Sequence, residues 1–148
     1  MDLPVGFLST SYQTDQGDSL TLYRPITIAE FPTVGGRSIS RRCLIDTCAP
    51  LSIVPYAVWH ARKLKWFSVS KTLHGLGGSA ALTWQGVPCE LGKIDIELAG
   101  PRKLVAKFAL QPTAPLDVIL GLNFLVDNDL ELVLGATRGS PSAKLVVP

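Results

Sequence analysis

One short stretch of the sequence carries an acid in a place where a carboxylate can do chemistry: CLIDTCAPLSIVP, residues 43–55. Asp46 follows the apolar pair Leu44 and Ile45, which is typical of the end of a buried strand, and it precedes a turn of small residues. An acid at a strand end commonly bonds its own backbone and starts a turn. The same carboxylate can instead be a reactive group, and the surrounding residues decide between these two interpretations.

The neighbours of Asp46 favour the reactive group. Apolar residues on both sides, such as Ile45 and Leu51, predict a mostly desolvated carboxylate, and the backbone N–H groups of Cys48 and Ala49 are expected to bond it. Burial and hydrogen bonding act in opposite directions on the ionisation of a carboxyl group. Groups under such opposed influences are often functional.

Two further segments support this interpretation. The first is DVILGLNFL, residues 117–125, in which an apolar strand ends at Gly121. Because glycine has no side chain, another segment of the chain can cross close to it. The alternative interpretation is an ordinary glycine at the start of a helix. In LHGLGG, residues 73–78, three glycines at a predicted hairpin tip let a ligand approach the backbone, as beneath a lid. A phosphate loop would need a following Lys-Ser/Thr, and an esterase would need G-x-S-x-G; neither motif is present.

The elements that must position these residues are mostly strands. We expect a helix of about two turns that begins at Pro55, and a turn at Gly35 and Gly36 between the first two strands. The tail can add a final hairpin. The predicted fold class is all-β, a barrel-like domain of about eight strands with one or two short helices. Strands are predicted in residues 20–31, 37–45, 51–55, 71–84, 93–100, 103–112, 117–120 and 129–134.

Composition excludes several other classes of protein. The chain has 148 residues, 47% of them hydrophobic, which suits one domain with a real core. A net charge of +2 does not favour nucleic acid, and no run approaches the roughly 18 apolar residues of a membrane span. Three cysteines without metal-ligand spacing predict neither a disulfide framework nor a zinc site. With no basic segment at its start, the sequence predicts a cytoplasmic protein with reduced thiols.

In order and rough spacing, LIDTCA, LHGLGGSA and VILGLNFL resemble the active-site loop, flap and closing motif of retropepsin-like aspartic proteases. The resemblance runs from about Pro25 to Leu134. It implies a retropepsin-like acid-protease barrel over residues 20–148, including the C-terminal hairpin. Residues 1–19 would then be an N-terminal arm or a processed leader.

The resemblance also implies an activity, that of an aspartic endopeptidase acting on an extended peptide without metal or cofactor. The family uses two aspartates that share a proton: one activates a water and the other polarises the scissile carbonyl. No other aspartate of this chain is followed by anything like T-x-A. The active form would therefore be a homodimer in which each subunit supplies one Asp46.

The resemblance assigns a role to each motif. Thr47 would bond across the two-fold axis, Leu76 would lie at the flap tip, and the tail would lie at or near the dimer interface. The implied site comprises catalytic Asp46; loop residues Thr47, Cys48 and Ala49; flap residues Leu73, His74, Gly75, Leu76, Gly77 and Gly78; and closing-motif residues Ile119, Leu120 and Gly121.

Two residues depart from the family pattern. Cys48 stands where the family has glycine, and Pro50 stands where many relatives bond the substrate backbone. Three alternatives follow from Cys48. The chain can be a working protease with a narrowed site, or a peptide-binding module without activity. The third alternative is redox control by the Cys48 thiols of two subunits. An active enzyme would also be expected to cut itself, and the bond between Phe7 and Leu8 is the predicted processing site.

Overall fold

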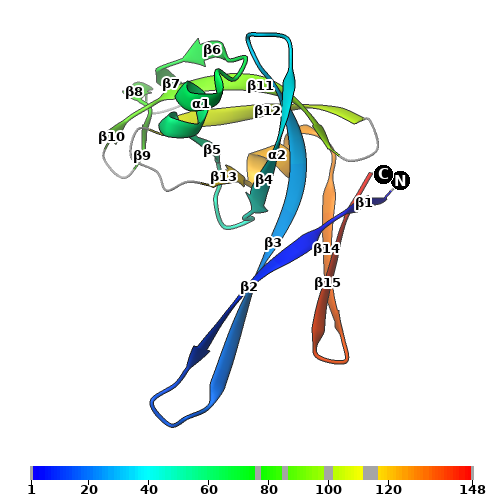
Figure 1. Cartoon of the computed structure of the whole chain (residues 1–148). Coiled ribbons are helices and arrows are strands. Elements are labelled where there is room, and N and C mark those ends of the chain that lie inside the picture. The colour runs from blue at the N-terminus through cyan, green and yellow to red at the C-terminus, as the bar shows by residue number, and fades with distance from the viewer. Residues whose placement is uncertain (1, 76–77, 85–86, 99–101, 112–116, 148) are drawn as a thin grey trace.

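The computed structural model describes residues 2–75, 78–84, 87–98, 102–111 and 117–147. Strands dominate these residues, and two short helices accompany them (Figure 1). The elements are β1 (Asp2–Pro4), β2 (Gly6–Gln13), β3 (Ser19–Pro32), β4 (Ser38–Ile45), β5 (Ser52–Pro55), α1 (Tyr56–Arg62), β6 (Phe67–Ser70), β7 (Thr72–Gly75), β8 (Gly78–Ala81), β9 (Thr83–Trp84), β10 (Val87–Pro88), β11 (Glu90–Leu98), β12 (Arg102–Gln111), β13 (Val118–Leu120), α2 (Leu122–Asp127), β14 (Glu131–Thr137) and β15 (Ser140–Val146).

The largest sheet has eight strands in the order β2-β3-β4-β13-β5-β12-β11-β6. It curls into a half-barrel because β11 also pairs with β3, which brings Glu97 opposite Glu30 and Leu98 opposite Ala29. Two pairings in this sheet, β4 with β13 and β5 with β12, are parallel, and the others are antiparallel. The mostly-β prediction is therefore confirmed at the level of fold class.

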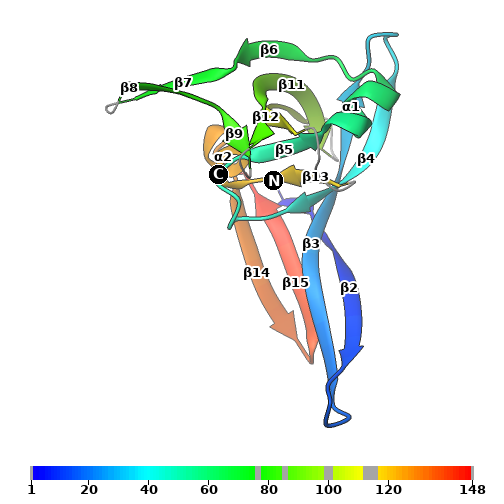
Figure 2. The ribbon, with the colours of Figure 1, turned by 90° about the vertical axis from the view of Figure 1, so that its left-hand side faces the viewer.

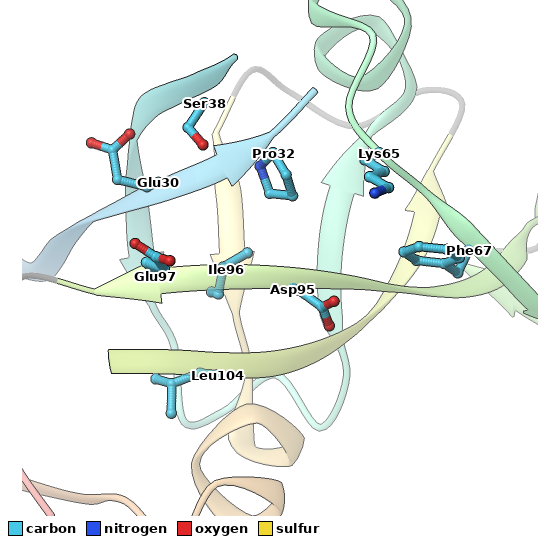
Figure 3. A pocket seen from close by; sticks show the side chains of 9 residues that line it. All are labelled: Glu30, Pro32, Ser38, Lys65, Phe67, Asp95, Ile96, Glu97 and Leu104. Atoms are coloured by element: carbon cyan, nitrogen blue, oxygen red, sulfur yellow. The ribbon is translucent and has the colours of Figure 1, made fainter. Parts of the chain in front are cut away.

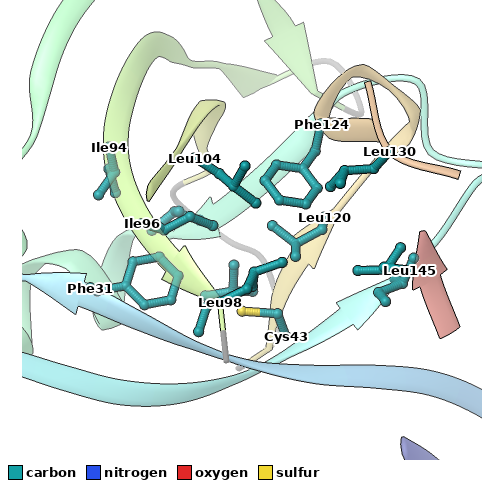
Figure 4. Packing of buried hydrophobic residues seen from close by; sticks show 14 of the residues in the cluster. Phe31, Cys43, Ile94, Ile96, Leu98, Leu104, Leu120, Phe124, Leu130 and Leu145 are labelled. Atoms are coloured by element: carbon teal, nitrogen blue, oxygen red, sulfur yellow. The ribbon is translucent and has the colours of Figure 1, made fainter. Parts of the chain in front are cut away.

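Alternating side chains line the inside of the curled sheet. Along β11, Ile94, Ile96 and Leu98 are buried, whereas Lys93 and Asp95 are exposed, as expected for one face of a strand against a core. Each fully buried side chain of this size contributes about 1.5–3 kcal/mol to folding. The same core contains Phe31, Cys43, Leu104, Leu120, Phe124, Leu130 and Leu145 (Figure 4).

A second sheet joins the two ends of the chain. Its order is β1-β15-β14, and the pairing places Leu3 opposite Leu145, both of them buried. The predicted C-terminal hairpin is confirmed, because β14 and β15 pair along their whole length. Figures 1 and 2 show this hairpin and the outer part of the β2–β3 hairpin projecting from the same side of the molecule.

Local signals in the sequence predicted several elements correctly. Gly36 has φ +86°, and its N–H donates to the carbonyl of Thr33 at 3.1 Å, which forms the expected turn. Helix α1 begins directly after Pro55, whose fixed φ of −62° suits a helix start. It ends at Arg62, and the C-cap residue Lys63 is in the left-handed conformation. The expected number of about eight strands is too low, because the structure has fifteen strands in its described residues. Short pairs such as β7–β8 and β9–β10 form sheets of their own.

No helix in the described part of the chain has the length and the apolar composition that crossing a membrane requires.

Candidate active site

Asp46 lies in the loop that follows β4, next to the end of the parallel strand β13. Its N–H donates to the carbonyl of Leu120 at 3.0 Å, so the loop is tied to the neighbouring strand. The N–H of Cys48 donates to the Asp46 carboxylate at 3.0 Å, as the sequence predicts. The N–H of Ala49 instead donates to the main-chain carbonyl of Asp46 at 3.1 Å and closes a turn. The carboxylate therefore has a defined orientation.

The expectation of a mostly desolvated carboxylate is wrong for the single chain. Asp46 is exposed, and so are Thr47 and Cys48. The apolar neighbours on either side of this turn, Ile45 and Ala49, are buried in the interior, while the turn between them faces solvent. Only a partner or a ligand that covers the turn would remove the carboxylate from water.

Gly121 lies where the Asp46 loop crosses the start of α2. A Cβ built at this glycine would lie 2.6 Å from the carbonyl oxygen of Ala49 and 2.8 Å from the carbonyl carbon of Leu51, closer than real Cβ atoms approach backbone. The N–H of Leu122 donates to the Ala49 carbonyl at 2.7 Å at the same crossing. The predicted close approach at Gly121 is therefore confirmed.

A buried polar network beneath this crossing was missed by sequence reasoning. The hydroxyl of Ser52 donates to Oδ1 of Asn123 at 2.8 Å and accepts from the N–H of Gly121 at 2.8 Å. The N–H of Ser52 donates to the same Asn123 oxygen at 2.8 Å. The available signals were a serine inside the apolar run LSIVP and an asparagine in GLNFL. Such a network fixes β5, β13 and α2 relative to one another.

A cavity of about 600 Å³ opens beside Asp46. The motif residues that it brings together are Asp46 and Ile119, from two different parts of the chain. Asp117 also lines the cavity, but its carboxylate is already engaged by the guanidinium of Arg42 at 3.3 Å. The lining residues are Tyr23, Arg24, Pro25, Leu44, Ile45, Asp46, Asp117 and Ile119.

The β-hairpin predicted around the glycines of LHGLGG is present. β7 and β8 pair with each other, with Leu73 opposite Ala80, His74 opposite Ser79 and Gly75 opposite Gly78. Gly78 has φ +105°, a conformation that favours glycine. Leu76 and Gly77, at the tip, lie outside the described residues. No described residue of this hairpin lines the cavity beside Asp46, and Figure 2 shows it extending away from the body.

The three cysteines lie in different environments, and all three thiols are free. Cys48 is exposed beside Asp46, and it is not among the described residues with positive φ, so a side chain at this position does not strain the backbone. Burial raises the pKa of the Cys43 thiol from 9.0 to about 12. Burial also raises the pKa of Cys89. Cys48 is thus the accessible thiol of the three.

A second cavity, of about 420 Å³, lies between β3, β6, β11 and β12 (Figure 3). It contains none of the predicted site residues. Its charged groups include Glu30, which accepts a hydrogen bond from Ser40, and Lys65, whose ammonium lies 5.8 Å from the centre of the Phe67 ring. The lining residues are Glu30, Pro32, Ser38, Lys65, Phe67, Asp95, Ile96, Glu97 and Leu104.

Within the described residues, no three His, Cys, Asp or Glu side chains gather closely enough to hold a metal ion. No protein-family model matches the sequence, and no curated protein matches it. The case for a function therefore depends on the residues around Asp46 and on their geometry.

Proposed function

We propose that this protein is an aspartic endopeptidase of the retropepsin type, active as a homodimer in which two Asp46 carboxylates form the catalytic pair. The observation that carries the proposal is the setting of Asp46. Its carboxylate is exposed, oriented by the N–H of Cys48, and placed at the edge of a cavity on a loop tied to Leu120. The crossing at Gly121 provides the rigid support that such a carboxylate needs.

A second carboxylate must come from a second subunit. The other carboxylate that lines the same cavity is Asp117, and it is already paired with Arg42. The exposed turn at Asp46 leaves space for the same turn of another copy. Two carboxylates brought together in this way cannot both ionise, so they retain one proton between them. One then acts as base on a water while the protonated one polarises the peptide carbonyl.

The substrate is a peptide in extended conformation. The hairpin β7–β8 supplies glycine backbone at Gly75 and Gly78, which can bond a peptide main chain without side-chain interference. The cavity walls next to Asp46 include apolar side chains of Leu44 and Ile119, suited to an apolar substrate residue. Cys48 is compatible with this function, since its backbone does not require glycine.

The test is cleavage of a diverse peptide mixture from about pH 4 to 7, with wild type and two variants at matched concentrations. Asp46→Asn is expected to lower the cleavage rate by at least about a thousandfold, because it removes the catalytic pair from both subunits. Asp117→Asn is the matched control from the same cavity. We expect it to keep cleavage within about tenfold, because an exposed ion pair such as Arg42–Asp117 contributes little.

Each outcome has a distinct meaning. A rate that rises faster than linearly with dilute enzyme, and that is lost only in Asp46→Asn, supports a dimeric protease. If Asp46→Asn and Asp117→Asn lost cleavage equally, the catalytic pair would be Asp46 and Asp117 of one chain, and no dimer would be needed. If wild type and Cys48→Gly are both inactive but bind the peptides equally well, the chain is a peptide-binding module and the proposal is wrong.

A further inference from the structure

The outer part of the β2–β3 hairpin is a two-stranded ribbon with one apolar and one polar face. We define the outer ribbon as residues 8–13 of β2 and 19–24 of β3. Residues that pair directly across antiparallel strands share a face. Thr10 opposite Leu22 and Tyr12 opposite Leu20 therefore form one face, which is apolar.

The opposite face of the ribbon is mostly polar. It carries Ser11 opposite Thr21, whose hydroxyls are 3.0 Å apart and share a hydrogen bond, and Gln13 opposite Ser19. Closer to the body, Tyr23 packs edge-to-face against Phe7 with ring centroids 6.4 Å apart. The amphipathic pattern thus holds for the four outer pairs, from Gln13–Ser19 to Thr10–Leu22, and ends nearer the body, where Arg24 lies on the first face.

The apolar face is left uncovered in the single chain. Tyr12, Leu20 and Leu22 are 52%, 47% and 48% exposed. Figures 1 and 2 show the ribbon standing clear of the curled sheet. A two-stranded ribbon is marginal in water unless its apolar face packs against something. The alternation of apolar and polar residues therefore indicates a surface made to be covered.

We propose that the apolar face of the outer ribbon packs against a second copy of this chain; this inference rests on the homodimer of the proposed function. The base of the ribbon reaches the proposed site, because Tyr23, Arg24 and Pro25 line the cavity that contains Asp46. A second copy that brings its own Asp46 to this cavity lies next to the base of the ribbon.

The composition of the ribbon suits contact with an identical surface. The outer pairs Thr10–Leu22 and Tyr12–Leu20 carry no charge, so two copies can pack these pairs together without like-charge repulsion. The charged residue of this face, Arg24, lies at the base of the ribbon. In a two-fold dimer the same patch occurs on both partners, and a patch must therefore be compatible with itself. A partner selected by charge would need ionic groups that the outer pairs of this face lack. The chemistry thus favours a second copy as the occupant.

The test compares two doubly substituted chains by sedimentation equilibrium over a range of concentrations. Leu20→Glu with Leu22→Glu places charge on the apolar face, whereas Ser9→Glu with Ser19→Glu places the same charge on the polar face. We expect the dimer dissociation constant to rise at least about a hundredfold in the first protein and to stay within about threefold in the second. Cleavage in the first protein should recover at high concentration, since its site is intact.

A milder variant and the thermal unfolding of every protein separate misfolding from a lost interface. Leu22→Ala removes apolar surface without adding charge and should raise the dissociation constant about tenfold. An unchanged dimer in both leucine variants would overturn this inference and leave the proposed protease intact. A wild-type chain that is monomeric at every concentration would overturn this inference, and if it also fails to cleave peptides, the proposed function fails with it.

Discussion

Two glycines of the predicted site motifs, Gly121 and Gly78, are required for different physical reasons. At Gly121 the backbone of Ala49 and Leu51 leaves no space for a Cβ, whereas at Gly78 the surrounding space is open and the positive φ alone disfavours other residues. The first glycine belongs to a crossing bonded to several elements. The second belongs to a hairpin that pairs only with itself. The carboxylate thus has a rigid support, and the hairpin can change without disturbing the core.

The largest effect is expected from Gly121→Ala. Its added Cβ meets backbone at 2.6 Å, which must move the Asp46 loop or α2. We expect the free energy of unfolding in urea to fall by about 3 kcal/mol. Gly6→Ala is the control, because its Cβ meets only the Ile26 side chain at 3.6 Å and should leave stability within about 0.5 kcal/mol. If both variants lowered the free energy of unfolding equally, the backbone would not approach Gly121 as closely as described.

The polar network beneath the crossing should give the next largest effect. Ser52→Ala removes the acceptor of the Gly121 N–H, in a buried hydrogen bond, and the donor to Asn123, in a partly buried one. We expect a loss of about 2 kcal/mol in the free energy of unfolding. The exposed hydroxyl of Ser9 provides the control, Ser9→Ala. A double-mutant cycle with Asn123→Ala should show coupling, and additive losses would mean that the network does not act as a unit.

The buried side of the site should also respond to alkali. Cys43 lies on β4, three residues before Asp46, and burial raises its pKa to about 12 from 9.0, with Asp117 adding to the rise and Arg41 opposing it. Because the folded state holds this proton more tightly than the unfolded state, its stabilisation is complete below pH 9 and is lost as pH rises toward 12.

The measurement for Cys43 is the free energy of unfolding at about pH 8 and about pH 10. Between these two values, wild type should lose about 1.4 kcal/mol more than Cys43→Ala. The comparison cancels the titration of groups that both proteins share. Parallel pH profiles would show that Cys43 does not retain its proton in the folded chain.

Features set by neighbouring residues could be predicted from the sequence. The turn at Gly36, the start of α1 at Pro55 and the hairpin around Gly75 and Gly78 each follow from the backbone preferences of a few residues. The crossing at Gly121 could be predicted because glycine at the end of an apolar strand lets another segment pass close to the backbone.

Features that depend on distant partners could not be predicted. Asp46 is exposed because the turn faces solvent and only its flanking residues Ile45 and Ala49 point into the interior. The apolar composition of residues 43–55 does not specify which side chains of the turn point inward. Ser52 and Asn123 are separated by 71 positions, and nothing local in either segment indicates the other. The pairing of β3 with β11 that curls the sheet is likewise long-range.

The smallest effect on stability is expected from Gly78→Ala, in the hairpin that pairs only with itself. The added Cβ meets no neighbour within 4 Å, so the cost comes from φ +105° alone, about 1 kcal/mol within the hairpin. Global unfolding should change by less than about 0.5 kcal/mol, because β7 and β8 form a separate sheet. Peptide cleavage should nevertheless show about a fivefold higher KM, if the hairpin binds substrate.

Ser79→Ala, at the adjacent exposed position, is the control for Gly78→Ala and should alter neither quantity. If Gly78→Ala destabilised the chain as much as Gly121→Ala, the hairpin would belong to the same cooperative unit as the core, and the distinction between a rigid support and an independent hairpin would fail. If KM stayed unchanged, the hairpin would not be part of the peptide site. A raised KM with unaltered stability would assign substrate binding to β7–β8 and would show that this hairpin is independent of the core.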